Sequence, residues 1–393
     1  MRQSGAEQGD DLPTLLVTGA GSAAAENLMR SLRRGDPSLA LLGCSEDRFA
    51  LQHSTADARY LVPRPGSRAF IRVLRGLIET RHVDLVIPTA DVHVNALSEA
   101  RNDLADKLFL PARRIISLCR DKYRLTVALR RRGIRAPETY PIIALGRIEG
   151  LFSRLHDRRP LWCRPRVGSC ARGGAAVSSP SQARAWIRIW NEMRGLPVRS
   201  FTLSEYLPGR EILCQSVWDR GRLVLTNTFE RLSYFGVDNI PSGVTSLSSL
   251  AKTVREPAVV DLCRDAIRAV APKASGVFSI DVKEDARGRP HITEINAGRF
   301  FMAMTAFDQV LEHSMALTYV RLALAQKVEL DEHYDGVDDY YMVRDLDTEP
   351  AVFHADRLFD GIAEPGATWR QTRPSGKGAT RWATNPTMAK LTK

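Results

Sequence analysis

Residues 275–296 read SGVFSIDVKEDARGRPHITEIN, two apolar segments joined by a polar turn at Asp285–Gly288. This pattern predicts a β-hairpin. Glu294 and Asn296 are two residues apart, so in a strand both side chains point to the same face. Asp281 lies on the first strand, and the turn brings it opposite the Glu294 end of the second. These oxygen-bearing side chains either face water at a sheet edge or bind a divalent cation such as Mg²⁺.

The bulk composition is that of a globular protein with two or three domains. The chain has 393 residues, of which 44% are hydrophobic, which is enough for a sizeable core. The six cysteines are scattered without a CxxC pair, a pattern that indicates reduced thiols and no zinc site. No apolar run is long enough to cross a membrane, and residues 1–14 lack the apolar core of a secretory signal. We therefore expect a cytoplasmic protein without a membrane partner.

The net charge is +11, which fits either a nucleic-acid partner or substrates that carry phosphates and carboxylates. Part of the excess lies in residues 365–393, which contain six arginines and lysines and no acidic residue. This stretch is rich in Gly, Pro, Ser and Thr, so we expect a poorly ordered tail. No nucleic-acid-binding motif accompanies the charges, and we expect no such partner.

Strands and helices alternate up to about residue 110, which predicts a parallel α/β sheet. Apolar strands are expected within 14–18, 39–47 and 83–91, and an amphipathic helix over 67–82. The first turn, residues 17–24, reads VTGAGSAA and meets a loose GxGxxA dinucleotide fingerprint. The same glycines would also serve simply to pack a helix onto a strand.

The remainder of the chain has a different pattern. Residues 117–142 predict one helix, a stop at Gly133 and an extended linker into a new domain. Hairpins then alternate with helices, which predicts an antiparallel α+β region. The expected fold class is therefore α/β plus α+β.

Two further segments have the chemistry of a phosphate or nucleotide site. Residues 164–174 read RPRVGSCARGG, where small residues let backbone amides approach phosphates and arginines add charge. The loop is not a Walker A motif, because GxxxxGK[ST] is absent. Residues 204–212 read SEYLPGREI, an extended hinge whose backbone could contact an adenine edge, with Glu211 in reach of ribose hydroxyls.

Taken in order, Asp-Lys at 121–122, the basic loop, EYLPGREI, SIDV and TEIN resemble the ATP-grasp superfamily over residues 14–325. That superfamily includes D-alanine–D-alanine ligase, carbamoyl phosphate synthetase, biotin carboxylase and the ligase of pyrrolysine synthesis. The resemblance implies an N-terminal pre-ATP-grasp parallel α/β domain followed by a two-subdomain ATP-grasp fold. The expected division is a disordered N-terminus (1–13), a pre-ATP-grasp domain (14–112), a central subdomain (113–185), a C-terminal subdomain (186–330) and an extension with a basic tail (331–393).

The resemblance also implies roles for individual residues. Mg²⁺, with Mn²⁺ as an alternative, would be bound by Asp281, Glu294 and Asn296. ATP would be bound through its phosphates by Lys122, Arg164, Ser169 and Arg172, through adenine by Glu205 and Leu207, and through ribose by Glu211. Arg231 and Arg299 would act in catalysis, and residues 233–247 would form a mobile loop.

The chain departs from the family pattern at three places. Arg164 stands where the family commonly has a lysine, and its forked guanidinium need not contact phosphate in the same way. Cys170 and Ala171 replace the usual Gly-Ser. Ala297-Gly298-Arg299 follows Asn296 where many members have Pro-Arg. Separately, Thr89 and Asp91 end a strand at the edge where open α/β sheets bind ligands, so both are candidates for a substrate contact.

The implied function is an ATP-dependent carboxylate–amine ligase that forms an amide through an acylphosphate and releases ADP and phosphate. Its partners would be a small carboxylate and a small amine, and a homodimer is left open. One alternative passes an acyl- or carboxyphosphate to a non-amine acceptor. Others are a nicotinamide-dependent oxidoreductase, from the glycine turn, and an ATP binder that has lost catalysis.

Overall fold

The computed structural model describes residues 12–156, 160–169, 171–345 and 349–357. Cys170, the predicted tail 365–393 and most of the predicted N-terminus 1–13 lie outside these residues. The chain divides into two units, residues 1–355 and 356–393. The first unit contains three sheets among the described residues, and these sheets carry the candidate site.

The first sheet is parallel, as the sequence predicts, and its strand order is β3-β2-β1-β4. Its central strand reads TLLVT and is almost wholly buried, which is typical of a parallel strand covered on both faces. The α2 helix buries Phe70, Leu74 and Ile78, which are four residues apart and lie on one face. Serine caps start both long helices, at Ser22 and Ser67. The elements are β1 (Thr14–Thr18), α1 (Ala23–Gly35), β2 (Ala40–Ser45), β3 (Ala58–Leu61), α2 (Arg68–Thr80), β4 (Leu85–Ile87) and α3 (Asp91–Glu99).

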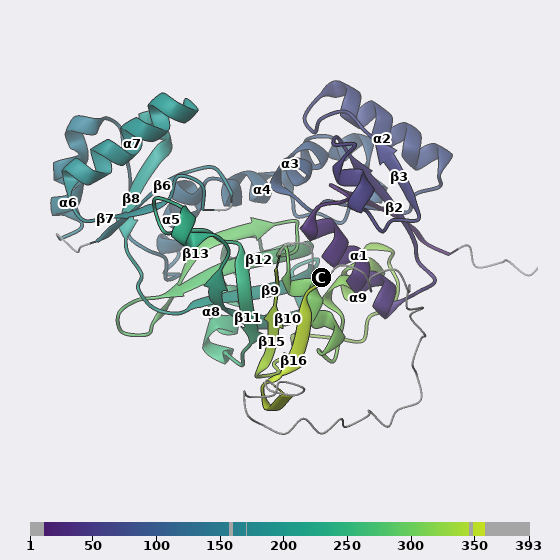
Figure 1. Cartoon of the computed structure of the whole chain (residues 1–393). Coiled ribbons are helices and arrows are strands. Elements are labelled where there is room, and N and C mark those ends of the chain that lie inside the picture. The colour runs from purple at the N-terminus through teal and green to yellow at the C-terminus, as the bar shows by residue number, and fades with distance from the viewer. Residues whose placement is uncertain (1–11, 157–159, 170, 346–348, 358–393) are drawn as a thin grey trace, which may run out of the picture. The chain divides into compact units, whose positions relative to one another are not determined.

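The second sheet is small and antiparallel, in the order β5-β8-β6-β7. Helices α6 and α7 bury their apolar side chains against one face of it, and both can be seen beside its strands in Figure 1. The predicted boundary at 185–186 lies inside α7, and the sheet takes its last strand, β8, from beyond that boundary. The elements are β5 (Thr139–Pro141), α6 (Ile148–Arg154), β6 (Leu161–Pro165), β7 (Ala175–Val177), α7 (Pro180–Arg194) and β8 (Phe201–Glu205).

The third sheet is large, with the order β13-β12-β9-β10-β11-β15-β16, and all of these neighbours are antiparallel. One face of β12 buries Phe278, Ile280 and Val282 in the same core as α8. Because strand side chains alternate, Asp281 is left on the opposite face. The elements are β9 (Glu211–Asp219), β10 (Arg222–Tyr234), β11 (Ser248–Thr253), α8 (Pro257–Val270), β12 (Gly276–Glu284), β13 (Pro290–Ala297), α9 (Met315–Ala323), β14 (His333–Tyr334), β15 (Tyr340–Val343) and β16 (Ala351–His354).

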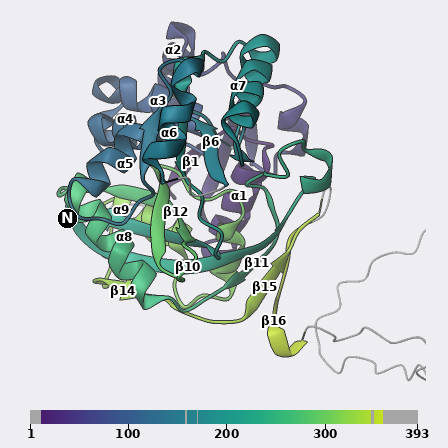
Figure 2. The same ribbon diagram turned by 90° about the vertical axis from the view of Figure 1, so that its left-hand side faces the viewer.

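The described part of residues 331–357 adds strands to this large sheet. β14 pairs in parallel with β10, and β15 pairs with β11, so the segment packs back on the core. Figure 2 shows β10, β11 and β15 running side by side. In the described residues, each helix is too short or too polar to cross a membrane.

The prediction of one helix from residue 117 to Gly133 is wrong. The structure has two helices, α4 (Arg113–Arg120) and α5 (Lys122–Arg130), because Asp121 adopts an extended backbone with φ −94° and ψ 98°. Its side chain accepts hydrogen bonds from the amides of Tyr123 and Arg124 and so caps α5. Asp121 also pairs with Arg166 at 2.6 Å. The break puts Lys122 in the first turn of α5, at the edge of the candidate site.

Candidate active site

The β12–β13 hairpin carries the predicted metal ligands, as expected, but with a β-bulge that the sequence did not reveal. Asp281 pairs with Glu294, whereas Val282 pairs with Ile292, so Thr293 is an extra residue. A bulge shifts the alternation of side chains. Ile292 and Ile295 are therefore both buried although they are three residues apart. Without the bulge, Glu294 could not share a face with Asp281 while Ile292 stays in the core.

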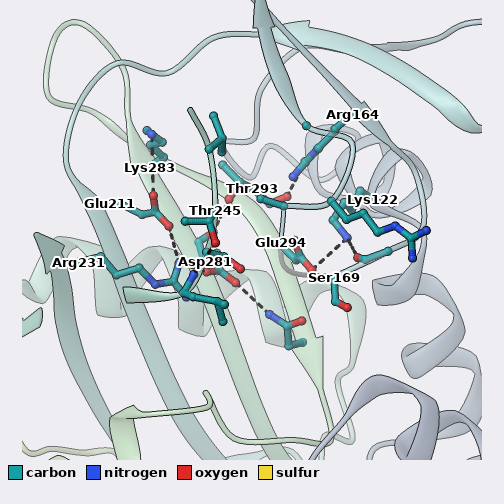
Figure 3. A pocket seen from close by; sticks show the side chains of 18 of the residues that line it. Lys122, Arg164, Ser169, Glu211, Arg231, Thr245, Asp281, Lys283, Thr293 and Glu294 are labelled. Carbon is teal, nitrogen blue, oxygen red and sulfur yellow. Dashed lines mark hydrogen bonds and ion pairs between the residues drawn. The ribbon is translucent and has the colours of Figure 1, made fainter. Parts of the chain in front are cut away.

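Asp281 and Glu294 each contact a basic side chain from another element of the cleft (Figure 3). Arg231 Nη1 lies 2.8 Å from Asp281 Oδ1, and Lys122 Nζ lies 3.1 Å from Glu294 Oε1. Asn296 donates to Asp281 Oδ2 at 2.9 Å. The acidic groups are thus compensated by side chains that come from β10 and α5.

Arg299 joins this hairpin to the parallel sheet. Its Nη2 donates to Asn296 Oδ1 at 2.6 Å, and its Nε pairs with Asp91 at the start of α3. The predicted contact residue Asp91 does not line the cleft itself, but it pairs with Arg299, which does. Thr89, in contrast, donates to the carbonyl of Thr18 at 2.7 Å and is held within its own sheet.

Glu211 forms a second acidic centre beside Asp281. It pairs with Arg231, accepts a 2.6 Å hydrogen bond from the Tyr234 hydroxyl and lies 3.9 Å from Lys283 Nζ. Neither Tyr234 nor Lys283 was predicted as a site residue. Lys283 could have been predicted from the sequence, because it is two residues after Asp281 and so lies on the same face of β12.

The electrostatics of the cleft follow from its burial. Burial raises the pKa of Asp281 to about 6. The positive charge of Arg231 acts to lower this pKa, and the negative charge of Glu294 acts to raise it. Burial would also raise the pKa of Glu211, but Arg231, Tyr234 and Lys283 outweigh it, and the net pKa is lowered. Burial lowers the pKa of the Arg164 guanidinium. Adjacent acids with pKa values moved in opposite directions are typical of functional sites.

The predicted phosphate loop lies above the hairpin. Arg164, on β6, donates from Nη2 to the carbonyl of the bulge residue Thr293 at 2.8 Å. Lys122 Nζ donates to the Gly168 carbonyl at 2.6 Å, and Ser169 follows directly at the cleft. Arg172 also lines the cleft, with its guanidinium 5.8 Å from the centre of the Trp190 ring. The substitution at Cys170 lies outside the described residues.

The predicted adenine hinge follows β8 and lines the same cleft. Glu205 Oε2 accepts a hydrogen bond from the Glu138 amide at 2.7 Å, which ties the hinge to the linker. Leu207 is buried. Thr89 and Asp91 do not line this cleft, but all of the predicted metal, nucleotide and catalytic residues do: Lys122, Arg164, Ser169, Arg172, Glu205, Leu207, Glu211, Arg231, Asp281, Glu294, Asn296 and Arg299.

The cleft is also lined by the end of the predicted loop and by Arg344, which had no signal in the sequence. Residues 244–248, at the end of the predicted loop, lie along the cleft, and Thr245 is labelled in Figure 3. The predicted mobility of residues 233–247 stays a prediction. Arg344 reaches the cleft from the end of β15 and donates to the carbonyl of Ser248 at 3.0 Å. No short motif marks Arg344, because its position depends on the pairing of β15 with β11.

The glycine turn after β1 packs closely against the neighbouring chain. The amides of Ala20, Gly21 and Ser22 donate to Cys44 O, Glu26 Oε1 and Gly19 O. A Cβ on Gly21 would lie 1.7 Å from the Ala50 carbonyl oxygen. Because these three amides are already hydrogen-bonded, they are not available to a dinucleotide pyrophosphate.

Comparison with known proteins supports the fold. No protein-family model matches the chain. Carboxyaminoimidazole ribonucleotide synthase from Aspergillus clavatus, solved with ATP, is 17% identical, with a TM-score of 0.62 over 84% of this chain and 81% of that one. L-amino acid ligase from Bacillus licheniformis is 13% identical, with a TM-score of 0.64 over 84% and 78%.

The biotin carboxylase domain of Hydrogenobacter thermophilus 2-oxoglutarate carboxylase was solved as a dimer with MgADP, ADP and bicarbonate. It is 12% identical, with a TM-score of 0.63 over 84% of this chain and 73% of that one. These identities are low, but the similarity covers most of each chain. The parallel N-terminal sheet and the two antiparallel sheets occur in the order that the sequence motifs predict. The chain therefore has the ATP-grasp fold.

Proposed function

We propose that this protein is an ATP-dependent ligase that joins a carboxylate to an amine through an acylphosphate and releases ADP and phosphate. One observation carries the proposal. Asp281, Glu294 and Asn296 share one face of a hairpin, in a cleft that also receives basic side chains from α5, β6 and β10. Acids and bases from distant parts of the chain thus converge where a charged ligand can replace their mutual contacts.

The donor set suits Mg²⁺. Two carboxylates and an amide oxygen are hard ligands, and magnesium prefers these together with phosphate oxygens. The raised pKa of Asp281 supports this fit, because a bound cation would stabilise the ionised form that burial disfavours. When bound, Mg²⁺ would neutralise charge that develops on the phosphates. Mn²⁺ could be held by the same atoms.

The nucleotide would lie between the hinge and the glycine-containing loop. Glu205 and Leu207 would contact adenine, and Glu211 would bind ribose hydroxyls. Lys122, Arg164, Ser169 and Arg172 would hold the phosphates. Lys122 and Arg231 now compensate Glu294 and Asp281. A cation at those acids would free both bases to contact phosphate oxygens.

Arg299 would orient the reacting carboxylate and the transferring phosphoryl group. Its pairing with Asp91 outweighs the effect of burial and raises the pKa of Arg299, so the side chain stays charged in the cleft. Arg344 is a further cation at the cleft wall, suited to an acidic substrate group. Residues 244–248 and the loop at 168–174 would cover the site and keep water from the acylphosphate.

A second candidate function also begins with the phosphorylation of an acid by ATP. It differs in the acid that is phosphorylated or in the acceptor that takes the activated group. Carboxyphosphate, formed from bicarbonate, would serve as well as an acylphosphate in the same cleft. The bicarbonate and MgADP bound in the Hydrogenobacter thermophilus domain favour this candidate. That domain is also a dimer, which supports a homodimer here. We place the protein in the cytoplasm as part of the same proposal.

Nucleotide choice can be tested by thermal unfolding. We expect ADP with Mg²⁺ to raise the melting temperature of the full chain, and NAD to leave it unchanged, because binding to the folded state stabilises it. A rise with NAD and none with MgADP would favour the oxidoreductase alternative. ADP formation should then be screened against carboxylic acids, bicarbonate and amines in pairs. Turnover that needs one acid and one amine supports the ligase, while turnover with bicarbonate alone supports the carboxylating alternative.

A further inference from the structure

Two histidines and a glutamate cluster outside the proposed active site. Glu312 and His313 precede α9, and His333 lies on β14, in the segment of the chain that the sequence motifs left unexplained. None of the three lines the cleft. Each offers one ligand atom, and these three atoms lie within 4.8 Å of one another.

The distances are close to those of a metal site. Glu312 Oε1 lies 3.5 Å from His313 Nε2, and Glu312 Oε2 lies 3.6 Å from His333 Nε2. The imidazole rings meet edge to face, with centroids 4.8 Å apart. Tetrahedral zinc with bonds of about 2.0–2.1 Å sets its ligand atoms about 3.3 Å apart. Small side-chain rotations would bring these atoms to that spacing.

A second observation points to a ligand. Within the described residues, the Nε2 atom of His333 is shielded from solvent and has no hydrogen-bond partner. A buried polar nitrogen without a partner is costly and calls for an explanation. This nitrogen faces Glu312 Oε2, at a distance slightly longer than a hydrogen bond. An ion bound between the two atoms would satisfy both.

The backbone holds both histidines in place. The amide of His313 donates to Asp335 Oδ2 at 2.9 Å, and the amide of Asp335 donates to the Thr226 carbonyl at 3.0 Å. His333 is in register with Leu225 on β10. Two ligands on segments fixed to one sheet require little reorganisation on binding, which favours affinity.

We propose that Glu312, His313 and His333 bind a transition-metal ion of the Zn²⁺ class. Two imidazoles and a carboxylate suit such ions, whereas Mg²⁺ and Ca²⁺ prefer ligands that are all oxygen. Three protein ligands leave a fourth position for water. The ion would join the start of α9 to β14 and so fasten the C-terminal strands to the sheet. The proposal does not depend on the function of the cleft.

The test uses the full untagged chain after treatment with a chelator. Zn²⁺ is titrated by calorimetry with excess Mg²⁺ present, and Co²⁺ is followed by its visible absorption, which is strong in a tetrahedral site. We expect one equivalent to bind and the melting temperature to rise with Zn²⁺ concentration. Glu312→Gln should weaken binding by about tenfold or more, and His313→Gln with His333→Gln should remove it. Glu312 is largely exposed, so its variant should fold.

Two controls separate this site from others. His53→Gln, at an exposed histidine outside the cluster, should bind Zn²⁺ as the unchanged chain does. Asp281→Asn should likewise keep this equivalent, since it alters only the cleft. The proposal is overturned if Zn²⁺ does not bind, or if Glu312→Gln and the double histidine variant bind it as tightly as the unchanged chain.

Discussion

The β12–β13 hairpin and the glycine turn after β1 both look like ligand-binding motifs in the sequence, yet their polar groups are satisfied in different ways. At the turn, three amides bond to a carbonyl of β2, a carboxylate of α1 and a carbonyl of the turn itself, and Gly21 is packed against Ala50. At the hairpin, Asp281 and Glu294 are satisfied by long cationic side chains from other elements. Side-chain ion pairs can be exchanged for a ligand, whereas a packed backbone cannot. Whether a glycine or an acidic residue in such a motif marks a ligand site therefore depends on which groups satisfy it in the folded protein.

At the hairpin, the largest effect is expected from Glu294→Gln. We expect Mg²⁺-dependent ADP formation to fall by about 10³-fold, because the variant loses the charge that holds the cation. The fold should persist, since Glu294 lies in the cleft and the apolar face of β13 is unchanged. Glu329→Gln, at an exposed residue, is the matched control and should keep full activity. Normal turnover in Glu294→Gln would contradict the metal assignment.

The turn is tested by Gly21→Ala against Gly66→Ala. Both glycines have left-handed backbones, with φ +85° and +86°, but only the Cβ at position 21 would collide with backbone. We expect Gly66→Ala to lower the free energy of unfolding by about 1 kcal/mol from backbone strain alone. Gly21→Ala should cost about 2–4 kcal/mol. Denaturant unfolding measures both, and equal losses would show that packing against Ala50 is not the reason for Gly21.

Substitutions at Arg164 test whether an arginine binds nucleotide as well as the lysine that the family commonly has at this position. Arg164→Ala should weaken MgADP binding by about 10–30-fold, because one charge-assisted phosphate contact is lost. Arg164→Lys should recover most of that affinity if only the charge is needed. Isothermal titration calorimetry distinguishes the two outcomes. If the lysine variant binds as poorly as the alanine variant, the forked contact to the Thr293 carbonyl is what positions the loop.

A smaller effect is expected from pH. Burial raises the pKa of Asp281 to about 6, whereas an unfolded aspartate titrates near about 3.9. The folded state keeps this proton to higher pH, so the contribution of Asp281 to the free energy of unfolding falls as pH rises from about 4 to about 6. The cation needs the ionised form, so Mg²⁺ affinity should be about tenfold weaker at pH 5 than at pH 7.

Asp281→Asn is the control for this pH dependence. Asp308 also has its pKa raised to about 6 by burial, so stability alone would mix two groups. Mg²⁺ binding measured in the presence of ADP reports the cleft and excludes Asp308. The asparagine variant should bind Mg²⁺ weakly and without the change near pH 6. The same pH profile in both proteins would assign the titration to another group.

Much of the fold and site was predictable because the relevant patterns are local. The alternation of strands and helices predicted the parallel sheet, and a turn at Asp285–Gly288 placed Asp281 beside Glu294. The helix break at Asp121 was missed, although an aspartate before a helical run is a capping signal. Arg344 could not be predicted, because its place depends on a strand that pairs with residues about ninety positions earlier.

The sequence by itself determined the parallel strands before residue 110 and the hairpin that brings Asp281 opposite Glu294. It could do so because strand patterns and turns act over a few residues, whereas the other cleft residues were assigned through the resemblance to a known family. Only the tertiary structure decided the bulge at Thr293, the pairing of Arg231 with two acids, and the meeting of His313 with His333. Those arrangements depend on how segments far apart in the chain pack together and bury one another's side chains, and no short stretch of sequence encodes them.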